Sequence, residues 1–131
     1  MFYLAAFVLG SIWGSFCNVC IYRLPDNDSV VTKRSFCRSC KNKIKWYDNI
    51  PLFSFIFLKG KCRGCKNKIS SQYFLVELIS AVSFLFIYFI YGISITTLLL
   101  IILSIFFIII FFIDLKHYII PNELTFPLML I

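Results

Sequence analysis

The sequence carries little charge and very few acidic residues. Charged side chains make up 15% of its 131 residues, and only six residues are Asp or Glu. In contrast, 60% of the residues are hydrophobic, 16 are Phe, and the mean hydropathy is +0.89. A soluble domain of this size does not have enough interior to bury so much apolar surface. The composition therefore excludes an ordinary soluble domain and indicates a membrane protein.

Basic residues are absent before the first apolar run, residues 2–21, and no small-residue cleavage site follows it. A secretory signal peptide has both features, so we expect a retained membrane helix here. Residues 74–91 and 93–113 form two more runs of about the 20 residues that cross a bilayer. A fourth run, residues 124–131, is too short to span, and we expect it to be the start of a helix that the end of the chain interrupts.

These runs predict an all-α polytopic membrane protein with three transmembrane helices and the start of a fourth. Residues 1–24 contain the first helix, and residues 25–72 form a polar loop. Residues 73–131 contain helices two and three and the start of helix four.

Positive charge is concentrated in the loop. Of the 13 Lys and Arg residues, 12 lie between Arg23 and Lys68, and the last is Lys116. Because Lys and Arg are enriched on the cytoplasmic side, we expect a multi-pass protein of the cytoplasmic membrane with its N-terminus outside and its loop inside. Asp114 and His117 then lie on the cytoplasmic face too. Since no RNA-binding motif accompanies the net charge of +7, we expect no nucleic acid partner.

Six cysteines form three Cys-x-x-Cys pairs, and two of these pairs belong to a repeat. The segments CRSCKNKI and CRGCKNKI match at seven of eight positions with a period of 25 residues. Four thiolates complete a tetrahedral Zn²⁺ site, and the 21 residues between the pairs are close to the usual spacing. We therefore predict a structural zinc in the cytoplasmic loop, held by Cys37, Cys40, Cys62 and Cys65.

Other interpretations of the cysteines stay open. Four thiolates also suit iron, whereas disulfides are disfavoured in the cytoplasm. Gly64, inside the second pair, is expected to make the tight turn that points backbone N–H groups at sulfur. Cys17 and Cys20 lie within the first helix without further ligands, so we expect them to be small buried hydrophobic side chains.

Small and polar residues also occur in the membrane helices. Gly10 and Gly14 form a Gly-x-x-x-Gly motif that predicts close approach of another helix, and Asn18 continues the same face. Glu77 is expected to reach the interface or pair with a loop cation, or else to line a polar site. Residues 50–58 are apolar but too short to span; they are expected to dock on the membrane interface or to form a small core under the zinc site.

Asp114 stands where the third apolar run stops. A carboxylate costs roughly 2.5–3.5 kcal/mol at the bilayer centre on insertion scales, and less near an interface. Taken alone, Asp114 is therefore an ordinary helix-end residue, and His117 is interfacial. Pro121 and Asn122 are expected to form a turn into the fourth helix, with Glu123 in its first turn.

Several motifs occur in an order that resembles one family. They are GSFCNVCIYRLP, the paired Cys-x-x-Cys, IPLFSFIFLKGKCRGC, ISSQYFLVEL and DLKHYIIPNELT. The chain resembles the N-terminal half of a type IV prepilin peptidase, a bacterial inner-membrane aspartic protease. The resemblance covers nearly the whole chain.

The resemblance implies cleavage of the basic leader of type IV prepilins or pseudopilins at the cytoplasmic membrane face. For many members it also implies N-methylation of the new N-terminus with S-adenosylmethionine. Asp114 would be the first of two catalytic aspartates, and the paired cysteines would form the zinc module. Supporting residues within the family motifs are Gly14, Asn18, Arg23, Glu77, Pro121 and Asn122.

The chain departs from the family pattern in its second aspartate. That residue belongs to a later Gly-x-Gly-Asp motif, which does not occur in these 131 residues, and Asn122 stands where many members carry Asp. One ionised carboxylate must activate water while one protonated carboxyl polarises the scissile carbonyl, so a lone Asp114 cannot supply both. We expect a truncated chain that is inactive alone. The alternatives are a non-catalytic membrane protein whose zinc module binds a cytoplasmic partner, and a redox protein.

Overall fold

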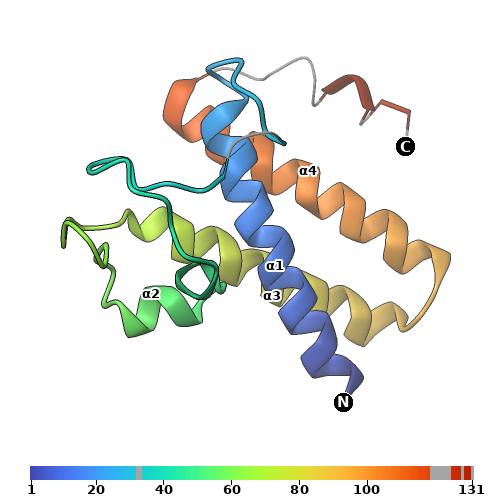
Figure 1. Ribbon diagram of the computed structural model, residues 1–131. Coiled ribbons are helices and arrows are strands. Elements are labelled where there is room, and N and C mark those ends of the chain that lie inside the picture. The colour runs from blue at the N-terminus through green and yellow to red at the C-terminus, as the bar shows by residue number, and fades with distance from the viewer. Residues whose placement is uncertain (32–33, 119–124, 128, 131) are drawn as a thin grey trace.

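Three long helices organise the computed structural model, which describes residues 1–31, 34–118, 125–127 and 129–130 (Figure 1). The elements in chain order are α1 (Phe2–Arg23), the 3-10 turn η1 (Trp46–Asn49), α2 (Phe53–Phe57), α3 (Ser71–Tyr91) and α4 (Ile95–His117). Over the described residues the only β-type pairing is two isolated bridges. The predicted helical fold class is therefore confirmed.

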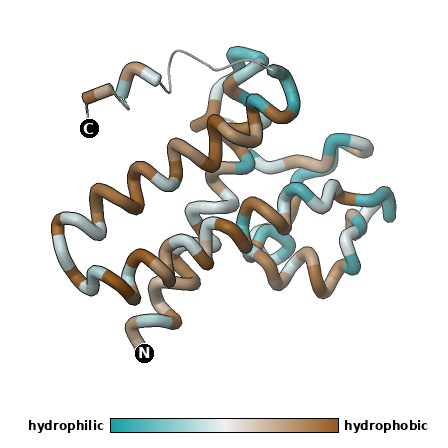
Figure 2. The backbone as a smooth tube through the Cα atoms, turned by 180° about the vertical axis from the view of Figure 1, so that it is seen from behind, coloured by the Kyte–Doolittle hydropathy of each residue, from teal (hydrophilic) through white to brown (hydrophobic). Residues whose placement is uncertain are grey.

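The three long helices are apolar and long enough to cross a membrane. α1, α3 and α4 contain 22, 21 and 23 residues, and α4 has the highest hydropathy. Figure 2 shows apolar residues along all three, with hydrophilic residues gathered in the segment between α1 and α3 and near the C-terminal end of α4. The prediction of three membrane helices is confirmed within the described part of the chain.

α3 begins before its apolar run and α4 ends after its apolar run, because capping residues set these two helix ends. The hydroxyl of Ser70 accepts a hydrogen bond from the N–H of Gln72, so α3 begins before the apolar run. α4 continues past Ile113 and ends at His117, because Tyr118 adopts a left-handed conformation with φ of 53°. The N–H of Tyr118 donates to the carbonyl of Asp114 at 2.8 Å. Asp114 is therefore in the last turn of a helix.

α1 and α3 pack antiparallel in a single register. Gly10 lies against Ala81, and Gly14 lies against Glu77. A Cβ at Gly14 would come within 2.6 Å of the Cα of Glu77, so only glycine permits this approach. Farther along, the amide nitrogen of Asn18 donates to the carbonyl of Tyr73 at 3.0 Å. The predicted role of the Gly-x-x-x-Gly motif in helix packing is confirmed.

α4 covers the C-terminal half of α1 on the side away from α2 (Figure 1). The core between the helices combines side chains of α1, α3 and α4 at one end of the bundle. Cys17 and Cys20 are both buried in it, which confirms that they are small core side chains. The members of the core are Cys17, Cys20, Ile21, Val76, Ile108, Ile109 and Ile113.

Candidate functional site

Two knuckles in the loop repeat each other in structure as well as in sequence. In the first, the N–H of Cys37 donates to the carbonyl of Asn42 at 2.9 Å, and a bridge joins Phe36 to Lys43. In the second, the N–H of Cys62 donates to the carbonyl of Asn67 at 2.9 Å, and a bridge joins Lys61 to Lys68. Each knuckle is therefore a tight loop that holds its two thiols on one side.

The left-handed residue of each knuckle is a lysine and not the glycine. Lys41 and Lys66, which directly follow the second cysteine of each pair, have φ of 56° and 57°. Gly64 does not have a positive φ, and a Cβ there would meet only ordinary contacts at 3.6 Å or more. Gly64 lies in the turn of the second knuckle, as expected, but its backbone conformation does not require glycine. The first knuckle carries Ser39 at the same position, which is consistent with ordinary backbone there.

The two knuckles bring their four thiols together. The Sγ atoms of Cys37, Cys40, Cys62 and Cys65 all lie within 4.8 Å of one another, and those of Cys37 and Cys65 are 3.7 Å apart. Four sulfurs placed tetrahedrally at a Zn–S distance of about 2.3 Å would be roughly 3.8 Å apart. The donor set and its spacing therefore fit a tetrahedral metal ion.

Backbone N–H groups also favour the thiolate form of Cys37 in this cluster. The N–H groups of Cys40 and Ser39 point at Cys37 and lower the pKa of its thiol to about 6. At Cys65, the N–H of Asn67 acts in the same direction, but desolvation and the neighbouring thiols raise the pKa to about 11. Four clustered sulfurs without a cation cannot all ionise easily, because each thiolate opposes the next. A bound cation would remove that opposition.

Arg23 and Asn18 hold the loop and the start of α3. The guanidinium of Arg23, in the last turn of α1, donates to the carbonyls of Ser29 at 2.9 Å and Val30 at 3.2 Å. Asn18 is 1% exposed and ties α1 to the first turn of α3 through Tyr73. Its Oδ1 atom has no hydrogen-bond partner among the described residues. Both residues therefore have a structural role at the loop end of the bundle.

Glu77 does not pair with a loop cation among the described residues. Its side chain is 8% exposed, and its Oε2 atom accepts a hydrogen bond from the backbone N–H of Leu52 at 2.8 Å. Leu52 precedes α2 and has φ of 62°, so its N–H is outside any helix. The expectation of an ion pair between Glu77 and a loop cation is wrong, because this carboxylate satisfies a buried backbone donor instead.

Asp114 is exposed at the same end of the bundle as the knuckles. The preceding residue, Ile113, is fully buried against the end of α1. No hydrogen bond or ion pair joins the Asp114 side chain to another described residue. Lys116 and His117, in the same last turn, are also exposed. The carboxylate is therefore accessible and not committed to holding the fold.

Tyr22 connects the first knuckle with the end of α4, a connection that is not evident from the sequence. The guanidinium carbon of Arg38 lies 3.6 Å from the centre of the Tyr22 ring, and the ammonium of Lys116 lies 3.8 Å from it. Tyr73 also stacks on this ring, with centroids 5.1 Å apart. Because Arg38 stands between Cys37 and Cys40, the ring connects the thiol cluster with the turn that carries Asp114. An aromatic residue beside Arg23 at a helix end was the available signal.

Residues 8–91 match the model of the Bacterial Peptidase A24 N-terminal domain. The chain belongs to this family. The match contains residues 8–23 of α1, both knuckles and α3, and it ends before α4 and Asp114.

Curated relatives of this peptidase family extend the similarity through α4. The chain is 44% identical to a prepilin leader peptidase/N-methyltransferase of Vibrio cholerae, over 95% of this chain and 52% of that protein. Proteins with the same description match in Myxococcus xanthus, at 40% identity over 99% of this chain and 39% of the relative, and in Klebsiella pneumoniae, at 37% over 94% and 57%. The chain thus spans about half the length of the curated relatives it matches. No solved structure matches it.

The peptidase-family match includes most of the residues predicted to support a site. Gly14, Asn18, Arg23, Glu77 and the four knuckle cysteines all fall within the matched residues. Pro121 and Asn122, with the turn expected around them, lie outside the described residues. Within the expected start of the fourth helix, the structure describes residues 125–127, which are helical, and residues 129–130, which form a turn.

Proposed function

We propose that this chain is the N-terminal part of a prepilin leader peptidase that cleaves the basic leader of type IV prepilins or pseudopilins at the cytoplasmic face of the membrane. The observation that carries the proposal is the family match over residues 8–91, together with relatives that bear this name. The three apolar helices fit a bacterial membrane enzyme, and the inner membrane is the proposed location.

Asp114 is the proposed catalytic residue of this chain. Its carboxylate is exposed in the last turn of α4, at the end of the bundle where the substrate's soluble leader would arrive. An ionised carboxylate there can take a proton from the attacking water. The reaction also needs a second, protonated carboxyl that hydrogen-bonds the scissile carbonyl.

We propose that the second catalytic carboxyl is not one of the described acidic residues of this chain. Asp48 is held in a bidentate ion pair with Arg63, and Glu77 accepts the hydrogen bond from Leu52. Neither carboxyl is available to share a substrate with Asp114, and neither Asp26 nor Asp28 belongs to a Gly-x-Gly-Asp motif. A Gly-x-Gly-Asp motif elsewhere in the complete enzyme would supply the partner.

Zinc is the proposed occupant of the thiol cluster. Cys37, Cys40, Cys62 and Cys65 would hold it, since their number and spacing suit tetrahedral coordination. When bound, the ion would cross-link the two knuckles and neutralise part of the thiolate charge. All four ligands are protein thiolates, so a structural role is proposed and not activation of water. Through Arg38 and Tyr22, the cross-linked loop would support the end of α4.

The relatives' names also include N-methyltransferase, which extends the proposal to a second activity. The methyl donor would be S-adenosylmethionine, and the acceptor would be the amine that leader cleavage exposes. This part of the proposal rests on the relatives' names alone.

The proposed peptidase activity is tested by processing of a prepilin. Membranes from cells that express the full reading frame around these residues are mixed with a prepilin carrying a basic leader, and the products are measured by mass spectrometry. We expect the free leader and the shortened pilin. Membranes without the reading frame are the control, and intact prepilin in both samples would overturn the proposal.

The same experiment separates this function from a non-catalytic role. A membrane protein whose loop only binds a cytoplasmic partner would leave the prepilin uncut while retaining its metal. Processing without methylation would restrict the function to the peptidase step. Adding S-adenosylmethionine and measuring the mass of the new N-terminus distinguishes these outcomes.

A further inference from the structure

The apolar segment between the two knuckles, residues 50–58, runs along the membrane helices away from their loop end and then turns back. Asn49 and Pro51 lie against the outward face of α1, where they line a shallow groove with Ile12 and Phe16. The chain turns at Leu52, which has φ of 62° and is buried. α2 then leads back toward the second knuckle (Figure 1).

The returning part runs antiparallel to the start of α3 in a constant register. The N–H of Leu52 donates to Glu77, and the ring of Phe55 lies 5.4 Å from that of Phe74. The carbonyl of Gly60 accepts from the N–H of Ile69 at 2.6 Å. Each contact is a few residues nearer to the start of α3 than the one before it. The segment therefore packs antiparallel along the first two turns of α3.

This register sets the depth of the turn. Glu77 follows Ser71, the first residue of α3, by six residues, which corresponds to about 9 Å along a helix. Leu52 is bound to Glu77 and is therefore well below the level of the loop end of the membrane helices. Interfacial helices typically bury their apolar face about 5–10 Å into the headgroup and acyl boundary. With the headgroup level at the first turn of α3, the turn before α2 would fall within this range.

Large apolar side chains of α2 are exposed, and two of them, Phe53 and Phe57, line an open hollow with Tyr47 and Arg63. Phe53, Ile56 and Phe57 are 59%, 61% and 81% exposed. Phe55, in contrast, turns inward to Phe74 and Gly60. α2 therefore has one face on α3 and another face of large hydrophobic groups with no protein cover in the described structure. A small core under the metal site would show the opposite exposure, so that interpretation is not supported.

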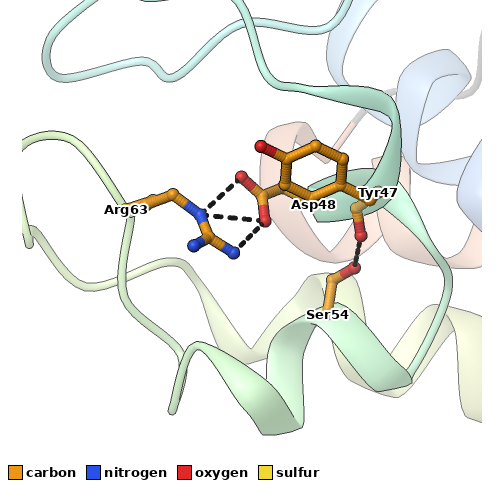
Figure 3. A network of polar contacts seen from close by, with 4 residues as sticks. All are labelled: Tyr47, Asp48, Ser54 and Arg63. Atoms are coloured by element: carbon orange, nitrogen blue, oxygen red, sulfur yellow. Dashed lines mark hydrogen bonds and ion pairs between the residues drawn. The ribbon is translucent and has the colours of Figure 1, made fainter.

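Polar groups in and around residues 50–58 have hydrogen-bond partners within the protein, as an apolar surrounding requires. Glu77 accepts the N–H that the turn at Leu52 leaves free, and a free backbone donor is costly in an apolar medium. The hydroxyl of Ser54 donates to the carbonyl of Tyr47 at 3.0 Å (Figure 3). Figure 3 also shows the carboxylate of Asp48 facing the guanidinium of Arg63, which joins the top of the segment to the second knuckle.

We propose that residues 50–58 form a shallow re-entrant segment, with the outer face of α2 embedded among the acyl chains of an anionic bilayer leaflet. The groove beside Asn49 and Pro51 continues the outward apolar surface of α1, so the lipid that covers α1 also reaches α2. On the protein side, Glu77 holds the turn of this segment through its hydrogen bond with the N–H of Leu52. This anchor fixes the metal module against the membrane, beside the end of α4.

Charge complementarity supports a lipid as the occupant. Exposed cations stand at both ends of the segment, and a negative leaflet attracts juxtamembrane Lys and Arg by about 1 kcal/mol each. Trp46, 80% exposed, stands at the descending end, where amphipathic rings prefer the headgroup level. The cations near the segment that form no ion pair with another described residue are Lys45, Lys59 and Lys61, whereas Arg63 is paired with Asp48.

Site-specific photo-cross-linking in native membranes tests this proposal. Phe57 is replaced by p-benzoylphenylalanine in the full reading frame, the membranes are illuminated, and the adduct is identified by mass spectrometry. We expect a phospholipid adduct at position 57. The substitution keeps an aromatic side chain on an exposed face, so it should not disturb folding.

Two matched positions keep the test decisive. The same probe at Phe55 should cross-link within the chain, near Phe74, and the probe at Ile44 on the first knuckle should give no lipid adduct. A protein cross-link at position 57, to a second copy or to another segment, would overturn the proposal. So would equal lipid labelling at positions 44 and 57. Prepilin cleavage is not measured here, so the outcome does not depend on the proposed peptidase activity.

Discussion

At the scale of single residues, Gly10 and Gly14 set the distance between α1 and α3. A Cβ at either position would come within 2.7 Å of α3 backbone atoms, which cannot move aside as a side chain can. Replacing both glycines by alanine should separate the helices at a cost of roughly 1–3 kcal/mol per site for overpacking. This cost exceeds the helix-propensity gain of about 1 kcal/mol per Gly→Ala change.

Thermal unfolding in detergent measures this effect. We expect the Tm of the Gly10→Ala/Gly14→Ala protein to fall. The matched control is Gly64→Ala, where the added methyl group meets only ordinary contacts and the Tm should stay the same. A double variant as stable as the original protein would contradict the packing described here.

Tyr22 is the second residue with an identifiable energetic role, because its ring contacts both Arg38 and Lys116. Each cation–π contact contributes about 0.5–2 kcal/mol, depending on its exposure. Tyr22→Leu should therefore lower the Tm, whereas Tyr22→Phe retains the ring and should stay close to the original value.

A double-mutant cycle isolates the contact with Lys116. Tyr22→Leu and Lys116→Gln are compared alone and together by thermal unfolding. We expect their effects to be less than additive. Strict additivity would mean that the ring does not connect the knuckle with the end of α4.

At the scale of structural elements, the knuckle pair depends on its four thiols. Cys40→Ser removes one donor, and three thiolates hold zinc far less tightly than four. Elemental analysis of the purified protein should give about one zinc per chain for the original protein and little for the variant. Cys17→Ala, which removes a buried thiol in α1, should leave the zinc content unchanged.

The metal analysis also decides between the open interpretations of the cysteines. Iron in place of zinc would change the proposed cofactor, and a protein free of metal with oxidised pairs would support a redox function. Unchanged zinc in Cys40→Ser would exclude this cluster as the site.

Elements that depend on local pattern were predictable from the sequence. Apolar runs predict membrane helices because length and hydropathy decide insertion. The repeated Cys-x-x-Cys predicts a thiol cluster because four soft donors need one another. In contrast, Glu77 and Leu52 are far apart in the chain, and only the packed register of α2 on α3 joins them. The Tyr22 contacts combine three separate segments in the same way.

The left-handed lysines of the knuckles illustrate another limit. Gly64 lies in the turn of the second knuckle, but the positive φ of each knuckle falls at Lys41 and Lys66. The hydrogen bonds that close each knuckle fix this position, and they become visible only when the backbone is known. Asp114 is a third case, since its exposure follows from how α4 packs on α1.

At the scale of the whole molecule, the distribution of charge predicts orientation. With 12 of the 13 Lys and Arg residues between Arg23 and Lys68, the knuckles should be cytoplasmic and the short turn between α3 and α4 should be outside. Alkaline phosphatase, which is active only outside the cytoplasm, should therefore be active when fused after Gly92 and inactive when fused after Lys68. The reverse pattern would invert the topology and place Asp114 on the wrong side for the proposed reaction.

The central claim is that Asp114 performs chemistry at the cytoplasmic end of a peptidase. Its exposed side chain has no structural partner among the described residues, so Asp114→Asn should leave the Tm and the metal content unchanged. Asp26→Asn is the matched control, because Asp26 is also an exposed carboxylate at the loop end of the bundle.

The most direct measurement is the initial rate of prepilin cleavage by the purified full-length protein. We predict that Asp114→Asn lowers this rate by about 100-fold or more, the usual effect of losing a general base, while Asp26→Asn cleaves at the original rate. Undiminished cleavage by a folded, metal-loaded Asp114→Asn protein would contradict the account.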